Sequence, residues 1–244
     1  MRTGVASLVL VLLSFSVVHA EEGAASLFDW LSLVLGRMGV GIPLVAVGAQ
    51  FGGYRAAMDF WNEELEAEGS DQSFGTGAVK GLGAQAGFGK HVFVRLDARH
   101  WTETVTAEGA RIQAETGFVS GRDQIILTTV PISVAGVVYP LGLRRWAFCP
   151  YVGVGGGPCL VRLKRTRTAS EGRSMTEQDT GSSLLGYVLA GVSRQLTYKL
   201  TVSAEGRYVL GGYVQQKLVG GVVEDRDVSL SGPQFEVRAY YRVW

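Results

Sequence analysis

The chain has 244 residues, enough for one large β domain or two small domains. Charged residues are 18% of the sequence, against about 25% in a typical soluble protein, and the mean hydropathy is +0.18. Its 34 glycines are about twice the usual share. With 23 basic and 22 acidic residues, the chain lacks the excess of positive charge that favours nucleic-acid binding.

The N-terminus has the pattern of a secretory signal peptide. Arg2 precedes an apolar run from Val5 to Val18, and the small-residue pattern ending at Ala20 is typical of a cleavage site. The run is shorter than the roughly 18–20 residues of a membrane-spanning helix, and no later run reaches that length. We predict a signal peptide at 1–20, a lead-in segment at 21–36 and one β domain at 37–244. Such a chain is typical of an outer-membrane β-barrel, with a secreted soluble barrel as the alternative.

Alternation of apolar and polar residues predicts eight strands. In chain order they are expected within residues 37–51, 78–88, 91–101, 124–141, 146–164, 182–193, 199–211 and 231–244. Long polar segments, predicted to be loops, alternate with short turns; they are 54–77, 102–123, 165–181 and 212–230. The motif NEELEAE in the first of them is compatible with a helical turn. Long loops at one end and short turns at the other predict an all-β fold, an eight-stranded antiparallel transmembrane β-barrel in an up-and-down meander.

Charged residues recur on one face of the third, seventh and eighth predicted strands. They are Arg95, Asp97, Arg99, Glu205, Arg207, Glu236, Arg238 and Arg242. Of the 23 basic residues, 18 are arginines, whose planar fork suits buried pairing with carboxylates. We predict a charged network inside the lumen, because an eight-stranded barrel is only wide enough for side chains. A soluble barrel that carries these charges outside is the alternative.

The same alternation predicts an apolar wall on the fourth, fifth and sixth strands. Its inward residues are Ile125, Leu127, Val152, Val154, Leu160, Leu185 and Leu189. Cys149 and Cys159 share the opposite parity and are expected to face lipid. Ten residues of strand separate the two cysteines by about 33 Å, beyond the roughly 7 Å that a disulfide spans. A lumen with one charged and one apolar wall suits a conduit for small apolar or amphiphilic molecules.

Aromatic residues gather near both ends of the predicted strands. At the short-turn end they are Tyr139, Trp146, Phe148, Tyr198, Tyr241 and Trp244. At the long-loop end they are Phe51, Tyr54, Trp101, Tyr208 and Tyr213. Two such rings predict aromatic girdles at the two membrane–water interfaces, although aromatics also favour strands in general.

Nothing in the sequence predicts catalysis, a metal or a cofactor. His91 and His100 with two cysteines fit no metal-ligand spacing, and His100 has no serine partner at a matching distance in sequence. The glycines of 153–157 are not followed by the Lys-Ser/Thr of a phosphate loop, so they are interpreted as a curved, closely packed strand. We therefore predict that the chain is not an enzyme.

Two segments resemble the outer-membrane protein W (OmpW) family of small eight-stranded barrels. They read TTVPISVAGVVYPLGLRRWAFCPYVGVGGG at 128–157 and YVLAGVSRQLTYKLTVSAEGRYVL at 187–210. The resemblance implies an outer-membrane barrel in contact with lipid, whose C-terminal strand engages the barrel-assembly machinery. The chain departs from the usual barrel ending, because Arg242 stands where an aromatic is common.

The resemblance also implies a porin-like function, namely a narrow passive channel for small, often apolar, molecules. The alternative is a structural or adhesive barrel with a plugged lumen, whose surface loops bind a ligand outside the cell. The sequence identifies neither the permeant nor the loop ligand.

Overall fold

The computed structural model describes residues 44–114, 117–144, 147–170, 172, 174–219 and 222–243. All of them belong to one compact unit, Leu44–Trp244. The predicted signal peptide at 1–20, the lead-in segment at 21–36, and Trp146 and Trp244 lie outside the described residues.

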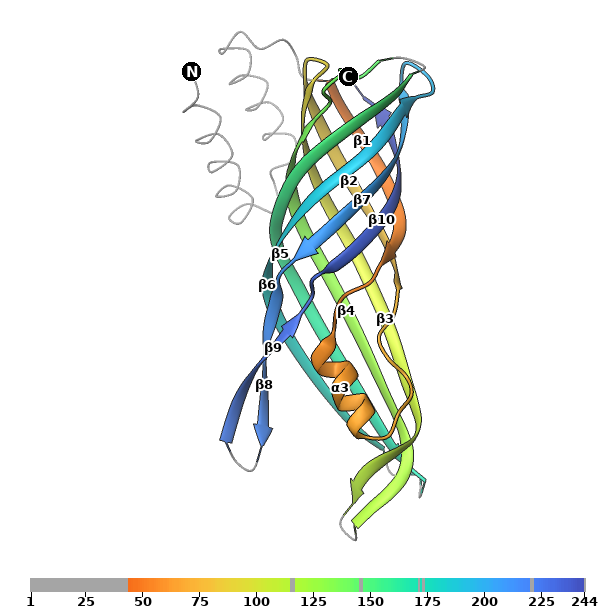
Figure 1. Ribbon diagram of the computed structural model, residues 1–244, viewed down its shortest axis with the longest axis vertical. Helices are drawn as coiled ribbons and strands as arrows, with labels where there is room; N and C mark the ends of the chain where they lie inside the picture. The colour runs from red at the N-terminus through yellow and green to blue at the C-terminus, as the bar shows by residue number, and fades with distance from the viewer. Residues whose placement is uncertain are drawn as a thin grey trace. The chain divides into compact units, whose positions relative to one another are not determined.

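Eight strands form a closed antiparallel barrel, as Figure 1 shows. They are β1 (Leu44–Tyr54), β2 (Gly77–Phe88), β3 (Val92–Ala114), β4 (Gly117–Val138), β5 (Phe148–Ala169), β6 (Ser174–Gln195), β7 (Leu200–Leu210) and β10 (Gly232–Arg242). Neighbours in sequence pair around the ring, and β10 pairs with both β7 and β1, which closes it. The predicted eight-stranded antiparallel barrel fold is confirmed.

Each barrel strand separates its side chains onto two faces. In β10, Glu236 and Arg238 are buried inside the barrel, whereas Phe235 and Val237 are 68% and 59% exposed outside it. This separation follows from the period of two along a strand, since a closed sheet has only an inner and an outer face.

The eight strands differ greatly in length. β1, β7 and β10 each have 11 residues, whereas β3 to β6 have 22 or 23 and continue beyond the others (Figure 1). The pairing of β2 with β3 ends at Thr102, yet β3 pairs with β4 as far as Ala114. Much of 102–123 and 165–181, predicted to be loop, is therefore strand, and β3–β6 form a four-stranded open sheet at the long-loop end.

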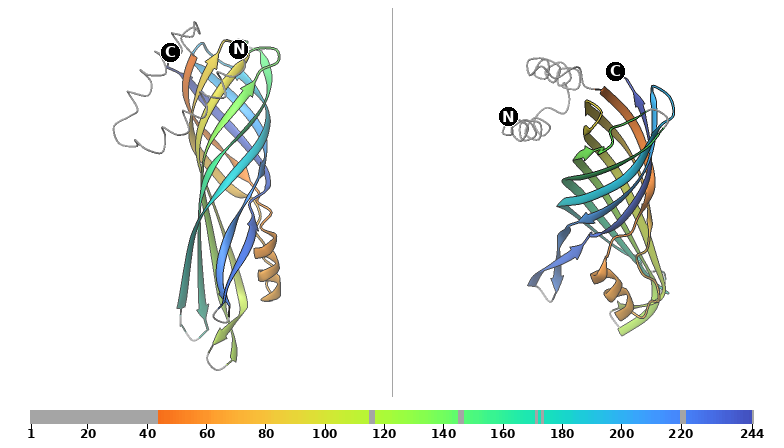
Figure 2. Two further views of the ribbon diagram at one scale, coloured as in Figure 1. Left: turned by 90° about the vertical axis from the view of Figure 1, so that its left-hand side faces the viewer. Right: turned by 45° about the horizontal axis from the view of Figure 1, so that its top comes forward.

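Two insertions lie beside this four-stranded sheet, and we call them the cap (Figures 1 and 2). The first is helix α3 (Asp59–Ala67), which lies between β1 and β2 and buries Trp61 and Leu65. The second is the hairpin of β8 (Gly212–Val219) and β9 (Val222–Ser229), in a segment predicted to be loop. Backbone hydrogen bonds join the two insertions, from Ala57 N to Ser231 O (2.8 Å) and from Met58 N to Ser229 O (3.3 Å). α3 is too short to cross a membrane, and no other helix lies in the described part of the chain.

Candidate functional site

Seven charged side chains fill the part of the lumen that all eight strands surround. We call Arg95, Asp97, Arg99, Glu205, Arg207, Glu236 and Arg238 the polar network. They project inward from β3, β7 and β10, and none of their side chains is more than 3% exposed. The predicted charged set thus meets at one level of the barrel, except for Arg242, which lies at the short-turn end beside a separate cavity.

Asp97 is the centre of the polar network. It accepts hydrogen bonds from both terminal nitrogens of Arg238 (3.2 Å each), from Arg207 (3.1 Å) and, more weakly, from Arg99 (3.4 Å). Because those arginines come from three strands, this one carboxylate ties β3 to β7 and β10 across the lumen.

The two glutamates complete the pairing. Glu205 accepts from Arg95 at 2.5 Å and from the nearby Arg207. Glu236 accepts from Arg238 at 2.6 Å. Four arginines face three carboxylates, which leaves one surplus positive charge when all are ionised. A buried network of this kind is strongly destabilised when one partner is removed, because an unpaired charge then stays in a medium of low dielectric constant.

Four tyrosines surround the polar network; Tyr139 was predicted for an aromatic girdle, and the other three were not among the predicted site residues. The Arg95 guanidinium lies 4.7 Å from the ring centre of Tyr151, and that of Arg207 lies 4.5 Å from Tyr187. Tyr151 Oη donates to Glu205 (2.9 Å), and Tyr240 Oη accepts from Arg238 (2.9 Å). The fourth, Tyr139, packs on Tyr151 with ring centres 5.0 Å apart. Strand parity could have predicted that Tyr240 faces the lumen, because Tyr240 follows Glu236 and Arg238 on the same face of the strand.

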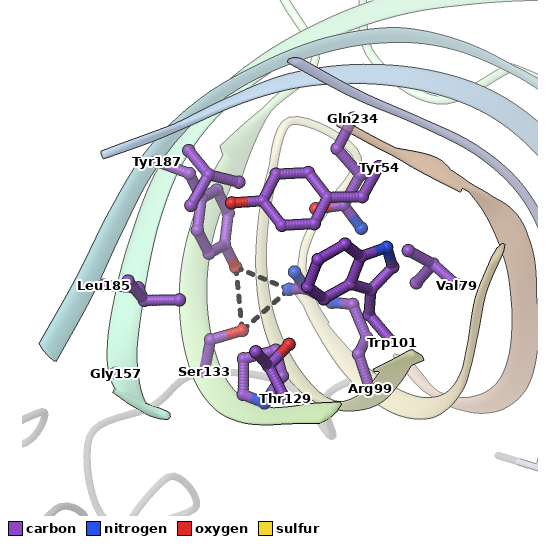
Figure 3. Close-up of a pocket in the computed structure, with 12 residues that line it drawn as sticks. Tyr54, Val79, Arg99, Trp101, Thr129, Ser133, Gly157, Leu185, Tyr187 and Gln234 are labelled. Carbon is purple, nitrogen blue, oxygen red and sulfur yellow. Dashed lines mark hydrogen bonds between the residues drawn. The ribbon is translucent and has the colours of Figure 1, made fainter. Parts of the chain in front are cut away.

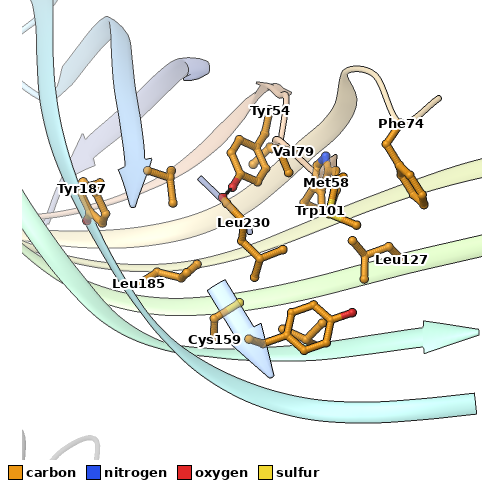
Figure 4. Packing of buried hydrophobic residues seen from close by; sticks show 14 of the residues in the cluster. Tyr54, Met58, Phe74, Val79, Trp101, Leu127, Cys159, Leu185, Tyr187 and Leu230 are labelled. Carbon is orange, nitrogen blue, oxygen red and sulfur yellow. Dashed lines mark hydrogen bonds between the residues drawn. The ribbon is translucent and has the colours of Figure 1, made fainter. Parts of the chain in front are cut away.

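Beyond the polar network, under the cap, the lumen is apolar (Figure 4). Of the predicted apolar wall, Ile125, Leu127, Leu185 and Leu189 are inward and no more than 8% exposed. They belong to one buried cluster with Met58, Trp61, Leu65, Phe74, Trp101, Tyr213 and Leu230. The side chains of the cap therefore occupy the space that a conduit would need.

The prediction for the fifth strand was wrong. Val152, Val154 and Leu160 face outward and are 53%, 64% and 58% exposed, whereas Cys149 and Cys159 face inward and are buried as free thiols. The sequence-based parity assumed that Arg162 and Lys164 point into the lumen. β5 instead continues past the ring, where both side chains are exposed on the outer face.

The aromatic residues predicted to form girdles divide between the outer surface and the interior of the barrel. Phe51, Phe148, Tyr198, Tyr208 and Tyr241 lie on the outer surface, each at least 50% exposed. Tyr54, Trp101, Tyr139 and Tyr213 are instead buried inside, at 5% exposure or less, so their assignment to a girdle was wrong. These four face inward, where Tyr54 packs edge-on against Trp101 with ring centres 5.2 Å apart.

One arginine attaches the cap to the barrel wall. Arg165 of β5 donates to Asp123 of β4 (2.7 Å from Nε), to Glu64 of α3 (2.6 Å) and to both oxygens of Glu68 (2.7 Å each). Burial acts to lower the pKa of Arg165, but the three carboxylates outweigh burial and raise that pKa above its usual value. Burial raises the pKa of Glu68 against the effect of Arg165. We call this group the Arg165 clamp; its residues were predicted to be loop.

Two cavities adjoin the polar network. One, of about 20 Å³, lies beside Arg99, Trp101 and Tyr187 (Figure 3), and a space of that size holds about one water molecule. The other, of about 220 Å³, lies at the short-turn end and is lined by Lys90, Lys199, Arg242 and nine other residues. The polar network and its tyrosines lie between this larger cavity and the cap.

No protein-family model matches the chain, and no curated protein matches it. Among solved structures, it is similar to Neisserial surface protein A (TM-score 0.44, 13% identity, 81% of this chain and 96% of that one). It is also similar to the outer membrane protein W of E. coli (TM-score 0.42, 16% identity, 82% and 98%). A third is the attachment invasion locus protein Ail of Yersinia pestis, in complex with the heparin analogue sucrose octasulfate (TM-score 0.42, 10% identity, 82% and 99%). OmpW, whose family the sequence motifs resemble, is thus among the solved structures similar to this chain.

Proposed function

We propose that this chain is an integral outer-membrane β-barrel with a closed lumen, whose extended sheet and cap form a rigid binding surface outside the cell. The observation that carries the proposal is the polar network. Its seven charged side chains are at most 3% exposed and occupy a section in which the eight described barrel strands enclose the lumen. An eight-stranded ring leaves room for side chains and little else.

The outer surface of the ring supports a membrane location. Large apolar side chains are exposed on every strand of the ring; examples are Val47, Leu82, Leu96, Ile132, Val154, Leu184, Tyr208 and Phe235. These exposed apolar side chains form a belt around the ring. On the described strands, outward-facing charged side chains lie above or below this belt, as Lys80 and Arg162 do at the long-loop end and Arg194 does at the short-turn end. The 11 residues of β1, β7 and β10 match the roughly 9–11 residues of a membrane-spanning strand.

The orientation follows from the same features. Bacterial outer-membrane barrels place short turns in the periplasm and long connections outside the cell. With the predicted signal peptide at 1–20 directing export, the cap and the long strands β3–β6 would be external. Assembly would then proceed through the C-terminal strand β10, which pairs with β1 to close the ring.

A second candidate is the narrow passive channel that the sequence predicts. The apolar compartment and the larger cavity favour it, because they lie on opposite sides of the polar network and form most of a path. Passage of a small apolar or amphiphilic molecule would require the Arg165 clamp to open and the polar network to move aside.

Planar-bilayer recording of the refolded mature protein distinguishes the two candidates. Heat-modifiable migration on gels first establishes that the barrel has folded. A closed lumen predicts no discrete conductance from such preparations. Discrete openings that an alkyl detergent blocks would contradict the closed lumen and favour the channel. Fractionation of the mature chain with soluble periplasmic proteins would contradict both.

A further inference from the structure

Two cations lie next to each other on the outer face of the extended sheet. Arg162 and Lys164 of β5 are exposed, whereas Leu163 between them is buried on the inner face. Leu160, which is 58% exposed, precedes them on the outer face and belongs to the apolar belt of the ring. The outer face of β5 thus changes from apolar to basic within two residues. Neither cation takes part in the proposed closure of the lumen.

The change occurs at the level where lipid headgroups are expected. Arg162 and Lys164 follow Leu160 by two and four residues, which is about 7 and 13 Å along the strand. Barrel strands tilt by about 35–45°, so the two cations stand about 5 and 10 Å above Leu160. The headgroup region on each side of the hydrocarbon core is roughly 5–8 Å deep. Arg162 therefore lies at headgroup level, and the long stem of Lys164 lets its ammonium group reach the same level.

Hydroxyl groups flank Arg162 on this face. Its partners in the sheet are Thr128 of β4 and Thr180 of β6. Directly paired residues share a face and have Cβ atoms about 5 Å apart, so the guanidinium lies between two hydroxyls in one row. Thr102 of β3 extends this row, with its Oγ1 3.2 Å from that of Thr128. Such a row offers an anion a charged fork and neutral hydroxyl donors together.

The charge of the two cations is not neutralised on this face. Arg162 donates to the neutral Oε1 of Gln178 (2.9 Å), and Lys164 has no hydrogen-bond or ion-pair partner among the described residues. On β4, β5 and β6, no carboxylate lies on this face within two positions of either cation, in a region that the structure describes in full. Like charges so close together repel each other, and a bound anion removes that repulsion.

This surface lies on one side of the barrel. The outer faces of the described strands β1, β7 and β10 carry no charged residue. Their exposed aromatic residues nearest the long-loop end are Phe51, Tyr208 and Phe235. A lipid that is held by charge would therefore bind along β5 and not around the whole ring.

We propose that the outer face of β5 binds the phosphate group of an outer-leaflet lipid, and we call its binding residues the headgroup patch. They are Arg162, Lys164, Thr128 and Thr180. The arginine fork and the lysine ammonium group are both common ligands of phosphate. The lipid matches the surface in order, because its acyl chains would pack on the belt at Leu160 while its phosphate meets the cations. The headgroup patch rests on the proposed membrane location and does not require a closed lumen.

The test uses protein refolded in an uncharged detergent, with native mass spectrometry of the retained bisphosphorylated lipid A, a phosphate-bearing lipid of bacterial outer leaflets. Arg162→Gln and Lys164→Gln are each expected to weaken retention about fivefold, and the double variant about 25-fold, because each cation near a membrane surface contributes about this much toward an anionic lipid. Lys164 has no partner among the described residues, so Lys164→Gln tests the headgroup patch without breaking a contact of the fold.

The matched control is Arg122→Gln, which removes another exposed cation from the outer face of the same sheet. Arg122 is already paired with Glu108 (3.1 Å) and lies opposite Thr168, four residues beyond Lys164 on β5. Its substitution should leave retention unchanged. Retention of lipid A without phosphate groups should be the same in all variants.

Two results would overturn the headgroup patch alone. One is equal weakening by Arg122→Gln and Lys164→Gln, and the other is full retention of bisphosphorylated lipid A by the double variant. Both leave the barrel and its closed lumen as proposed, provided that heat-modifiable migration shows a folded protein. Fractionation of the mature chain with soluble proteins would instead overturn the membrane location together with the headgroup patch.

Discussion

The two halves of this barrel are filled in opposite ways. Where all eight strands form the wall, the interior is a buried network of arginines, carboxylates and tyrosines. Where only β3–β6 continue, the interior is an apolar cluster completed by α3 and the β8–β9 hairpin. The polar network is thus enclosed by the strands themselves, and the apolar half needs inserted segments to complete its wall.

The difference follows from how each half is closed. A closed ring satisfies its own backbone, and long side chains from facing strands meet across it, so arginine forks and carboxylates are able to pair there. An open four-stranded sheet presents an apolar inner face that water would otherwise reach. Covering that face with Trp61, Leu65 and Tyr213 stabilises the half through burial of apolar area.

The largest expected effect comes from removing the centre of the polar network. Asp97→Ala leaves Arg207 and Arg238 without their shared acceptor, so the free energy of unfolding should fall by about 4 kcal/mol. Urea unfolding of the refolded protein in detergent, followed by circular dichroism, measures the change.

The control for Asp97→Ala is Glu66→Ala, which removes an exposed carboxylate of α3. It should change the free energy of unfolding by less than about 0.5 kcal/mol. Similar small effects of both substitutions would mean that the polar network is hydrated and that the lumen is open to water.

A pair of leucines tests the apolar half. Leu127 is fully buried under the cap, and Leu184 is 77% exposed on the outer surface. Leu127→Ala should cost about 3 kcal/mol, because it removes apolar contacts and leaves a cavity. Leu184→Ala loses only its transfer into lipid, about 1.5 kcal/mol. Equal losses in the same urea experiment would contradict the assigned inner and outer faces.

Alternation was sufficient to predict the eight-stranded fold and the inward direction of most charged residues. Arg95, Asp97 and Arg99 alternate with apolar residues in the first part of β3, and nothing in that stretch disturbs the period. The aligned faces of β7 and β10 then bring Glu205 and Glu236 to the same level, where they are paired neighbours in the sheet.

The features that were not predicted, namely the parity of β5 and the Arg165 clamp, depend on where the ring ends. Alternation along a strand does not show where that is. Arg162 and Lys164 lie on the outer face of a strand that has already left the ring, so their charge says nothing about the lumen, and the parity of β5 was inverted. Arg165 was predicted to start a loop, because residues 165–181 are rich in polar side chains. Its three carboxylate partners come from segments up to 101 residues away in the chain. Contacts at such separations follow from the fold, not from a local pattern.

The Arg165 clamp determines how firmly the cap closes the apolar half. Arg165→Gln should weaken the docking of α3 by about 2 kcal/mol, because several charge-assisted hydrogen bonds are lost. Proteolysis between β1 and β2 should then accelerate roughly 30-fold, while cleavage of the eight-stranded ring stays slow.

The matched substitution is Arg167→Gln on the same strand. The Arg167 side chain is 26% exposed and lies 3.5–3.9 Å from the same carboxylates. Pairs this exposed are worth less than about 1 kcal/mol, so the acceleration should be several times smaller. Equal rates for both variants would show that the cap is held by its apolar contacts alone.

The smallest effect is a pH dependence of the same docking. Burial raises the pKa of Glu68 above its usual 4.5, aided by the like charge of Asp123 and opposed by Arg165. The docked state therefore binds the proton more tightly than the undocked state does. By linkage, docking is strongest below pH 4.5 and weakens as the pH rises through the raised pKa.

Hydrogen exchange of the α3 amides, corrected for the intrinsic rate at each pH, measures this docking equilibrium directly. Protection should decrease from pH 4.5 upward in the unmodified protein and should be flat in Glu68→Gln, whose side chain does not titrate. Protection that instead increases with pH would mean that Arg165 outweighs burial at Glu68. Charge pairing would then hold the clamp together, as it does the polar network, and the two halves would differ chiefly in their apolar contacts.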